Sequence, residues 1–293
     1  MAAVCLLLAF SVPVLGIWVA ARISRKPIQT VSDRRGRQAA FLSVCAPPLF
    51  VLAGVGLGLL GSPISDITAW LILWGAVAVF VWPNGTKPLP ERQGSAASAR
   101  VAHGILAGLI LLFVAFHLFN HLSGWLGPDA HRAVMALGRQ VYRSDVGEPI
   151  LLGLLLAQIA LGAWLVWWWS VNSTDGYRTF QVASGDYLAF FILTHLNSAL
   201  ISARLLRGVE TDWAWATGAP TGLLLDAWNI RLLPHYAFAV FFVLTHLVAG
   251  LRVVLLAHGT EVRLARRVWW VGMAASIAVA LAIALALCGI RLR

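Results

Sequence analysis

The sequence predicts an all-α membrane protein, a polytopic bundle of about eight transmembrane helices. Two features of composition and one of pattern predict this class. Hydrophobic residues make up 60% of the 293 residues, charged residues make up only 12%, and long apolar runs recur along the chain. A soluble domain of this size could not bury so much apolar surface.

The apolar runs define the predicted spans. Most are long enough to cross a hydrocarbon core of roughly 30 Å, and the third run is the shortest. In the second run Pro47 and Pro48 predict a kink. The eight runs lie near residues 1–21, 39–61, 66–82, 101–125, 148–171, 186–206, 232–257 and 268–290.

The net charge of +10 indicates a bilayer rather than a nucleic acid as the partner, because the basic residues lie between apolar runs. The larger share of the 22 Lys and Arg residues falls in the loops after the first, third, fifth and seventh runs. The positive-inside rule therefore predicts that those loops are cytoplasmic and that both termini lie outside. Residues 1–21 lack a basic start and a small-residue cleavage site, so we interpret them as a retained span.

A break in composition at residues 83–99, rich in Pro, Gly, Ser and Ala, predicts a linker. Residues 1–82 before it form a predicted three-helix membrane module with no ionisable residue near a span centre. Residues 100–293 after it form a predicted five-helix domain. The three cysteines are dispersed, and the lack of a Cys-x-x-Cys pair excludes a protein-bound iron–sulfur cluster or a covalently attached haem in this chain.

One pattern recurs on three of the last five runs: a histidine follows a phenylalanine by one helical turn. The three histidines are His117, His195 and His246, and the run between the first two carries Gln158 at the corresponding depth. An imidazole inside the membrane is costly unless it has a partner or a function. Four helices are therefore predicted to present one polar side chain each toward a common level.

Glycines accompany two of these positions. Gly162 follows Gln158 by four residues, and Gly250 follows His246 by four residues. A missing side chain one turn along the same helix face makes room for a flat ring such as a porphyrin or a quinone. The glycines therefore indicate a cofactor-binding interior.

The segment after the fourth run predicts a short helix on the outer membrane surface. Gly127-Pro128-Asp129 is its predicted turn and N-cap, and Val134, Leu137 and Val141 share one face. Its arginines Arg139 and Arg143 are either a solvated rim or the partners of an anionic group, such as a haem propionate. The later loop 207–231 is rich in Trp and is interpreted as a lid.

The predicted spans contain no buried carboxylate pair, nucleophile elbow or phosphate-binding glycine loop. The chemistry that the sequence still indicates is the binding of a cofactor by imidazole side chains. Two histidines from different helices at one depth are the usual way in which a membrane bundle holds a b-type haem. The sequence thus favours electron transfer over acid–base catalysis.

In these motifs the sequence resembles the cytochrome b membrane anchor of succinate dehydrogenases and fumarate reductases, in its single-chain, five-helix, two-haem form, over about residues 100–290. The matching motifs are the early His103, His117-Leu118-Phe119-Asn120, Tyr142-Arg143 before Glu148, Gln181-x-x-Ser184-Gly185 with His195 ten residues on, and His246-x-x-x-Gly250. The sequence departs from the family at Ala107, at Gln158 and in its extra N-terminal module.

The resemblance implies that residues 100–293 form a cytochrome b-like domain in which His117 and His195 are the axial ligands of a b haem. Gln158 stands where the family has a ligand of a second haem, which places that haem in question. His246 is then a second haem ligand, a quinone contact or a hydrogen-bond partner of Gln158. The resemblance further suggests a quinone near His103, Gln181 and Ser184.

By the same resemblance the chain is a non-catalytic haem and quinone subunit in a bacterial inner membrane. It would relay electrons between a quinone pool and a peripheral dehydrogenase, with a flavoprotein and an iron–sulfur subunit as partners. The alternative from another class is a non-redox membrane scaffold derived from such an anchor. A haem spectrum discriminates between the two.

Overall fold

A computed structural model describes residues 2–26, 28–82, 87–89, 95–172 and 174–292. The described residues are helical with no strand, and one isolated bridge joins Thr30 to Pro88. The long helices are α1 (Ala2–Ser24), α2 (Val31–Val44), α3 (Ala46–Leu59), α4 (Asp66–Val81), α5 (Ala97–Ser123), α6 (Pro128–Tyr142), α7 (Gly147–Trp169), α8 (Gly176–Leu196), α11 (Leu232–Ala257) and α12 (Val262–Leu287). Short helices are η1 (Gly124–Leu126), η2 (Asn197–Leu206), α9 (Trp213–Ala216), α10 (Gly222–Leu225) and η3 (Asn229–Arg231). The prediction of an all-α membrane bundle is confirmed.

Six helical segments among the described residues are long and apolar enough to cross a membrane. A bent pair, α2 and α3, adds a seventh if it forms one span, and α4 is a shorter apolar helix. The predicted count of eight is therefore not confirmed. The six segments are Ala3–Ser24, Ala97–Leu126, Gly147–Trp169, Gly176–Leu206, Asn229–Ala257 and Val262–Leu287.

The predicted kink of the second span lies at Cys45. Helices α2 and α3 meet there at a bend of 71°. Pro47 and Pro48 occupy the first turn of α3, where a missing N–H costs nothing, but they cannot continue the hydrogen-bond ladder of α2. The two prolines therefore end α2 and are compatible with the start of α3.

The chain divides into two compact units. The first unit contains residues 1–96 and 163–198, and the second contains residues 97–162 and 199–293. The first division, between residues 96 and 97, falls inside the predicted linker 83–99, of which residues 83–86 and 90–94 lie outside the described part. Residues 163–198, predicted within the five-helix domain, belong to the first unit, so the predicted domain boundaries stay a prediction.

In the first unit, α1 packs closely on α2 because Gly16 has no side chain. A Cβ atom at Gly16 would lie 2.6 Å from the Ser43 hydroxyl oxygen. The buried guanidinium of Arg37 donates to the carbonyl of Asn172 and, at 2.6 Å, to the hydroxyl of Thr174. Arg37 thereby ties α2 to the segment between α7 and α8.

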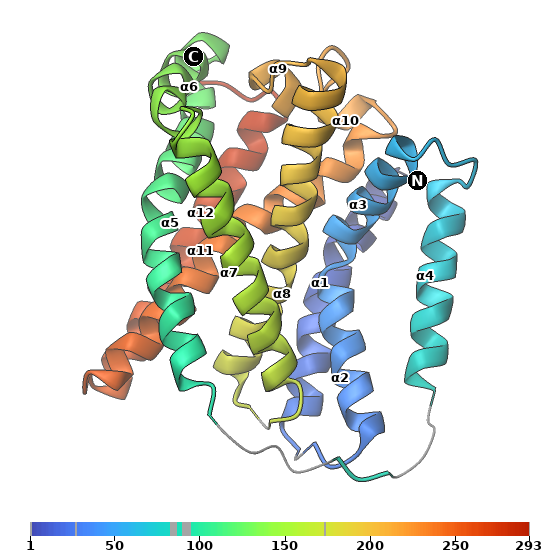
Figure 1. Cartoon of the computed structure of the whole chain (residues 1–293), viewed down its shortest axis with the longest axis vertical. Helices are drawn as coiled ribbons and strands as arrows, with labels where there is room; N and C mark the ends of the chain where they lie inside the picture. The colour runs from blue at the N-terminus through green and yellow to red at the C-terminus, as the bar shows by residue number, and fades with distance from the viewer. Residues whose placement is uncertain (1, 27, 83–86, 90–94, 173, 293) are drawn as a thin grey trace. The chain divides into compact units, whose positions relative to one another are not determined.

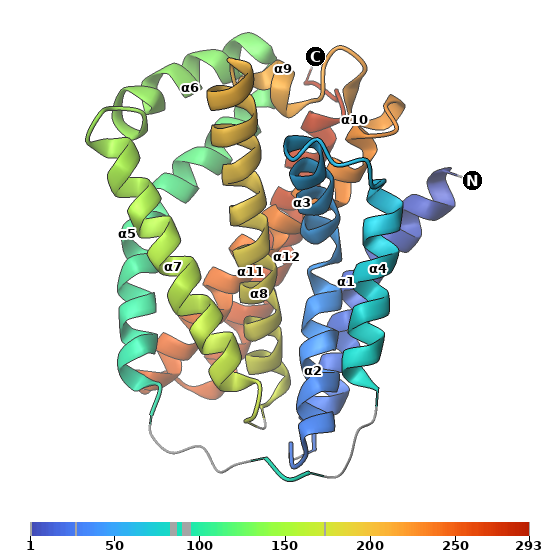
Figure 2. The ribbon, with the colours of Figure 1, turned by 45° about the vertical axis from the view of Figure 1, so that its right-hand side comes forward.

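In the second unit, α11 and α12 pack against each other along their length (Figure 1). Helix α6 contacts α5 and is inclined to it (Figure 2). The chain turns between these two helices at Gly127, whose φ of 112° is unfavourable for other residues. Gly127 is the N-cap and Pro128 the first helical residue, so the cap lies within the predicted turn Gly127-Pro128-Asp129.

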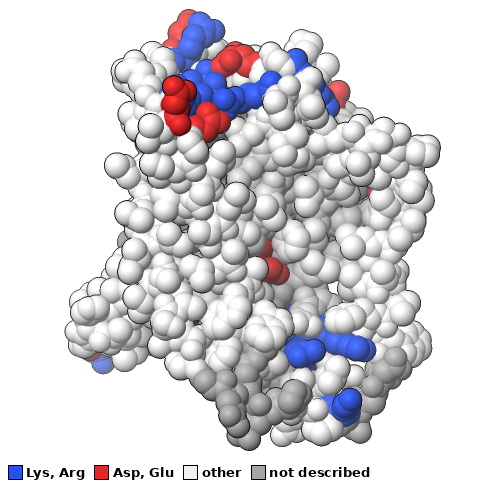
Figure 3. Space-filling view, viewed as in Figure 1, with Lys and Arg blue, Asp and Glu red and all other residues white. Residues whose placement is uncertain are grey.

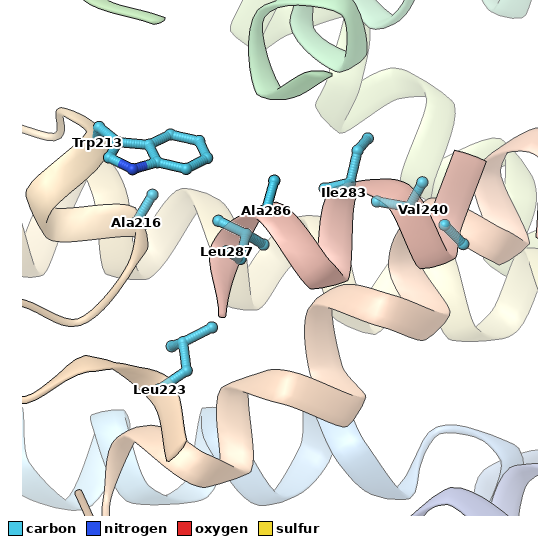
Figure 4. Close-up of a cluster of buried hydrophobic side chains, with 8 residues drawn as sticks. Trp213, Ala216, Leu223, Val240, Ile283, Ala286 and Leu287 are labelled. Carbon is cyan, nitrogen blue, oxygen red and sulfur yellow. The ribbon is translucent and has the colours of Figure 1, made fainter. Parts of the chain in front are cut away.

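A hydrophobic core of the second unit lies at the end of α12. Trp213 and Ala216 of α9 and Leu223 of α10 surround Ala286 and Leu287, and Val240 of α11 belongs to the same cluster (Figure 4). The indole of Trp213 also lies against Gly124, so closely that a Cβ atom there would overlap it. The Trp-rich loop is thus part of the core.

Gly124→Ala should lower the thermal unfolding midpoint of the purified protein, because an added methyl group must displace the Trp213 ring. Overpacking of a core costs about 1–3 kcal/mol. Gly108→Ala is the matched control, since nothing lies within 4 Å of a Cβ atom at Gly108. Equal midpoints for the two variants in detergent would contradict the packing of Trp213 on Gly124.

Candidate functional site

The three-residue cluster His103, Gln158 and His246 forms the polar interior of the second unit. These residues come from α5, α7 and α11. The side-chain amide nitrogen of Gln158 lies 3.1 Å from Nε2 of His103. The rings of His103 and His246 are 6.2 Å apart at 82°. Three helices therefore bring one polar side chain each to a common place, with His103 between Gln158 and His246.

The two glycines beside this cluster differ in what they do. A Cβ atom at Gly162 would lie 3.4 Å from Cε1 of His103, so Gly162 lets the imidazole approach α7. A Cβ atom at Gly250 would have nothing within 4 Å. Gly162 makes room for His103, and Gly250 leaves open space one turn from His246.

The second haem stays a prediction, because this cluster contains two imidazoles, those of His103 and His246, together with the amide of Gln158. Haem iron in a bundle takes a nitrogen from each of two imidazoles, and an amide side chain is a poor substitute. Gln158 instead hydrogen-bonds to Nε2 of His103. Among the described residues, no group of three or more His, Cys, Asp or Glu side chains is placed to hold a metal ion.

His117 and His195 share one local geometry. The His117 ring stacks on Phe113 with a centroid separation of 5.5 Å and an interplanar angle of 22°. The His195 ring stacks on Phe191 at 5.5 Å and 14°. The Phe–His pattern read from the sequence thus produces the same stacked pair on α5 and on α8. His117 belongs to the second unit and His195 to the first, so their pairing stays a prediction.

Arg139 and Arg143 of α6 both bind one acidic residue of the same unit. Arg139 pairs with the carboxylate of Glu210 and donates to the Thr211 carbonyl at 3.1 Å. Arg143 lies 3.3 Å from the same carboxylate and donates to the Thr211 hydroxyl at 2.6 Å. Burial, together with the charges of Arg139 and Arg204, lowers the pKa of Arg143, while Glu210 opposes this shift.

Figure 3 shows basic and acidic side chains next to one another at the end of the second unit that carries α6. The arginines of α6 thus have an anionic partner in their own chain. A cofactor propionate at this place would have to displace Glu210, whose side chain is 61% exposed. The predicted cofactor role of Arg139 and Arg143 stays a prediction.

The predicted quinone contacts are each hydrogen-bonded within their own unit. In α8, Ser184 is fully buried and donates to the Gln181 carbonyl at 3.0 Å. The Gln181 side-chain oxygen accepts from Arg178 at 2.6 Å. His103 contacts Gln158 in the other unit. The structure brings Gln181 and Ser184 together. A quinone site that also includes His103 stays a prediction.

Sequence reasoning missed His131, which is buried in α6. Its Nε2 lies 3.1 Å from the Asn120 side-chain nitrogen, and its ring lies 4.6 Å from Trp213 and 5.7 Å from His121. Burial lowers the pKa of His131 to about 4, Asp212 opposes this shift and Arg139 adds to it. The sequence shows only that a histidine lies on the predicted interfacial helix. A histidine at such a position is usually exposed to solvent, so the sequence does not indicate that His131 is buried.

Comparison with protein-family models, with curated proteins and with solved structures finds no match to this chain. The resemblance described above therefore rests on the short motifs alone.

The buried neutral form of His131 predicts a pH-dependent stability. Between pH 6.5 and about 4 the unfolded chain binds a proton at this residue that the folded chain does not. Stability is therefore fully present above pH 6.5 and falls with pH toward 4, by up to about 3 kcal/mol. His131→Gln should flatten this dependence in thermal unfolding scans from pH 7 to pH 4.5.

His258→Gln is the control for this experiment, because His258 is exposed at the end of α11. It should keep the pH dependence of the wild type. An unchanged slope in His131→Gln would contradict the burial of a neutral imidazole at this position.

Proposed function

We propose that the chain is a membrane electron-transfer subunit that holds a b-type haem, with His117 and His195 as axial ligands. The observation that carries the proposal is the shared stacking geometry of these two imidazoles on Phe113 and Phe191. A haem in an apolar interior accepts and releases one electron without oxygen chemistry. The pairing of the two histidines rests on the sequence motifs.

The residues of this chain would prepare the ligands before haem arrives. Stacking on a phenylalanine one turn earlier restricts the rotation of each imidazole, so less conformational entropy is lost on ligation. Apolar side chains around both helices exclude water, which favours electron transfer. Two imidazoles from two membrane helices can supply both axial nitrogens of a b haem.

The proposed electron partners are a quinone and a peripheral dehydrogenase. The chain itself offers no flavin site or dicarboxylate site that the sequence or the described residues indicate. By the resemblance, the dehydrogenase would consist of a flavoprotein and an iron–sulfur subunit docked on the cytoplasmic side of a bacterial inner membrane. The proposed quinone would lie near His103, Gln181 and Ser184.

A second candidate function is a non-redox membrane scaffold. The observation that favours it is that polar side chains pair within the chain: Gln158 bonds to His103, and Glu210 binds both Arg139 and Arg143. Such pairs stabilise the protein without a cofactor. Its helices would then serve to seat another complex.

A reduced-minus-oxidised spectrum of the purified full chain separates the two functions. The haem proposal predicts a b-type α band in the wild type and its complete loss in His117→Ala and in His195→Ala, because each removes an axial nitrogen. His258→Ala, an exposed histidine at the end of α11, is the matched control and should keep the band. A colourless wild type, or a full band in either ligand variant, would contradict the proposal.

A further inference from the structure

The second unit contains a cavity of about 280 Å³ that the proposed electron transfer does not use. It lies where the start of α6, helix α9 and the tail after α12 meet. Its wall carries two guanidinium groups, one carboxylate, an indole and a hydroxyl group. The lining residues used below are Pro128, Arg132, Asp212, Trp213, Thr217 and Arg291.

The cavity is built from the ends of two apolar spans. The span Ala97–Leu126 ends two residues before Pro128, and the span Val262–Leu287 ends four residues before Arg291. The tail after α12 is tied to the first of these spans, because the Leu292 N–H donates to the Trp125 carbonyl at 3.0 Å. Both spans reach the membrane surface at their ends, which places the cavity at the level of lipid head groups.

Arg291 is held in position at this boundary. Its guanidinium lies over the Trp213 ring, 5.1 Å from the centroid. One of its nitrogens, Nη1, donates to the carbonyls of Ala286 and Ile290 at 2.6 and 2.8 Å. The charge of Arg291 is thus fixed on the cavity wall by a ring and by the end of α12.

The other two charges differ in how firmly they are engaged. Among the described residues Arg132 pairs with the exposed Asp129 at 3.0 Å, a contact that water screens and that a ligand can replace. Asp212 is the N-cap of α9 and accepts the Trp215 N–H through one oxygen at 3.0 Å. The wall therefore combines two cationic groups with one anionic group.

A buried donor adjoins this wall. The indole nitrogen of Trp213 is buried and has no hydrogen-bond partner among the described residues, although the residue lines the cavity. Since this nitrogen has almost no accessible surface, a molecule in the cavity cannot reach it, and Trp213 contributes its ring to the wall.

We propose that this cavity binds the zwitterionic head group of a phosphoethanolamine lipid, with its phosphate on Arg132 and Arg291 and its ammonium on Asp212. Guanidinium groups match phosphate oxygens, and a carboxylate matches a primary ammonium. Leu126 and Leu292, next to the cavity in sequence, are 70% and 63% exposed and offer apolar surface to the acyl chains. A purely anionic lipid has no partner for Asp212.

Native mass spectrometry of the full chain in detergent tests this site. Phosphatidylethanolamine and phosphatidylglycerol with the same acyl chains are titrated separately, and the wild type should bind the former more tightly. Asp212→Asn keeps an N-cap residue on α9 and removes the charge. It should weaken binding of phosphatidylethanolamine about tenfold and leave phosphatidylglycerol binding unchanged.

Further variants distinguish the contribution of the charged groups to lipid binding from the contribution of the cavity volume. Arg132→Gln and Arg291→Gln should weaken both lipids, and Ala214→Leu should do so by filling the cavity without changing charge. Arg263→Gln is the matched control, since Arg263 is exposed and lies 3.9 Å from Glu261. Thermal unfolding identifies any variant that misfolds. If Arg291→Gln unfolds, Arg132→Gln alone tests the cationic wall, because the Arg132 side chain is exposed.

Three outcomes would overturn the proposal. Equal affinity for the two lipids in both the wild type and Asp212→Asn would show that no group recognises the ammonium. An equal loss in Arg263→Gln would show unspecific attraction to surface charge. Displacement of the bound lipid by soluble phosphoethanolamine at comparable concentration would show that the cavity serves a soluble ligand. None of these results depends on whether the protein binds haem.

Discussion

The hydrogen bond between Gln158 and His103 is the constraint on which the interior of the second unit depends. An imidazole within an apolar span needs a polar partner, and here an amide from α7 supplies it to α5. Gly162 allows the two helices to approach closely enough, and the His246 ring reaches the same place from α11. Three helices are thus joined at one place in the second unit.

The sequence predicted those features of the fold that depend on a local pattern of residues. Long apolar runs predicted α5, α7, α11 and α12 to within a few residues, and Pro47 predicted the break between α2 and α3. Helix α8 begins at Gly176, earlier than expected, because its polar first turns, including Ser184, are buried against other helices. A polar sequence at a helix start does not reveal such burial.

Contacts between distant residues could not be predicted in the same way. Glu210 follows an apolar helix without any periodic signal, yet it binds both arginines of α6. His131 lies on a helix predicted to be interfacial, but its contacts with Asn120 and Trp213 depend on how α6 and α9 pack. Residue type and spacing predict which polar side chains lie on the helices, and the folded chain shows which of them contact one another.

The ratio of haem to polypeptide in the purified full chain tests the central claim most directly. In the proposed function His117 and His195 are the ligands of one iron, and Gln158 stands where the resemblance places a ligand of a second haem. The account therefore predicts one haem per polypeptide, from the pyridine haemochrome spectrum and quantitative amino-acid analysis of the same sample. A ratio near zero would contradict the proposed electron carrier, and a ratio near two would contradict the assignment of Gln158 and His103 to a hydrogen bond in place of a haem.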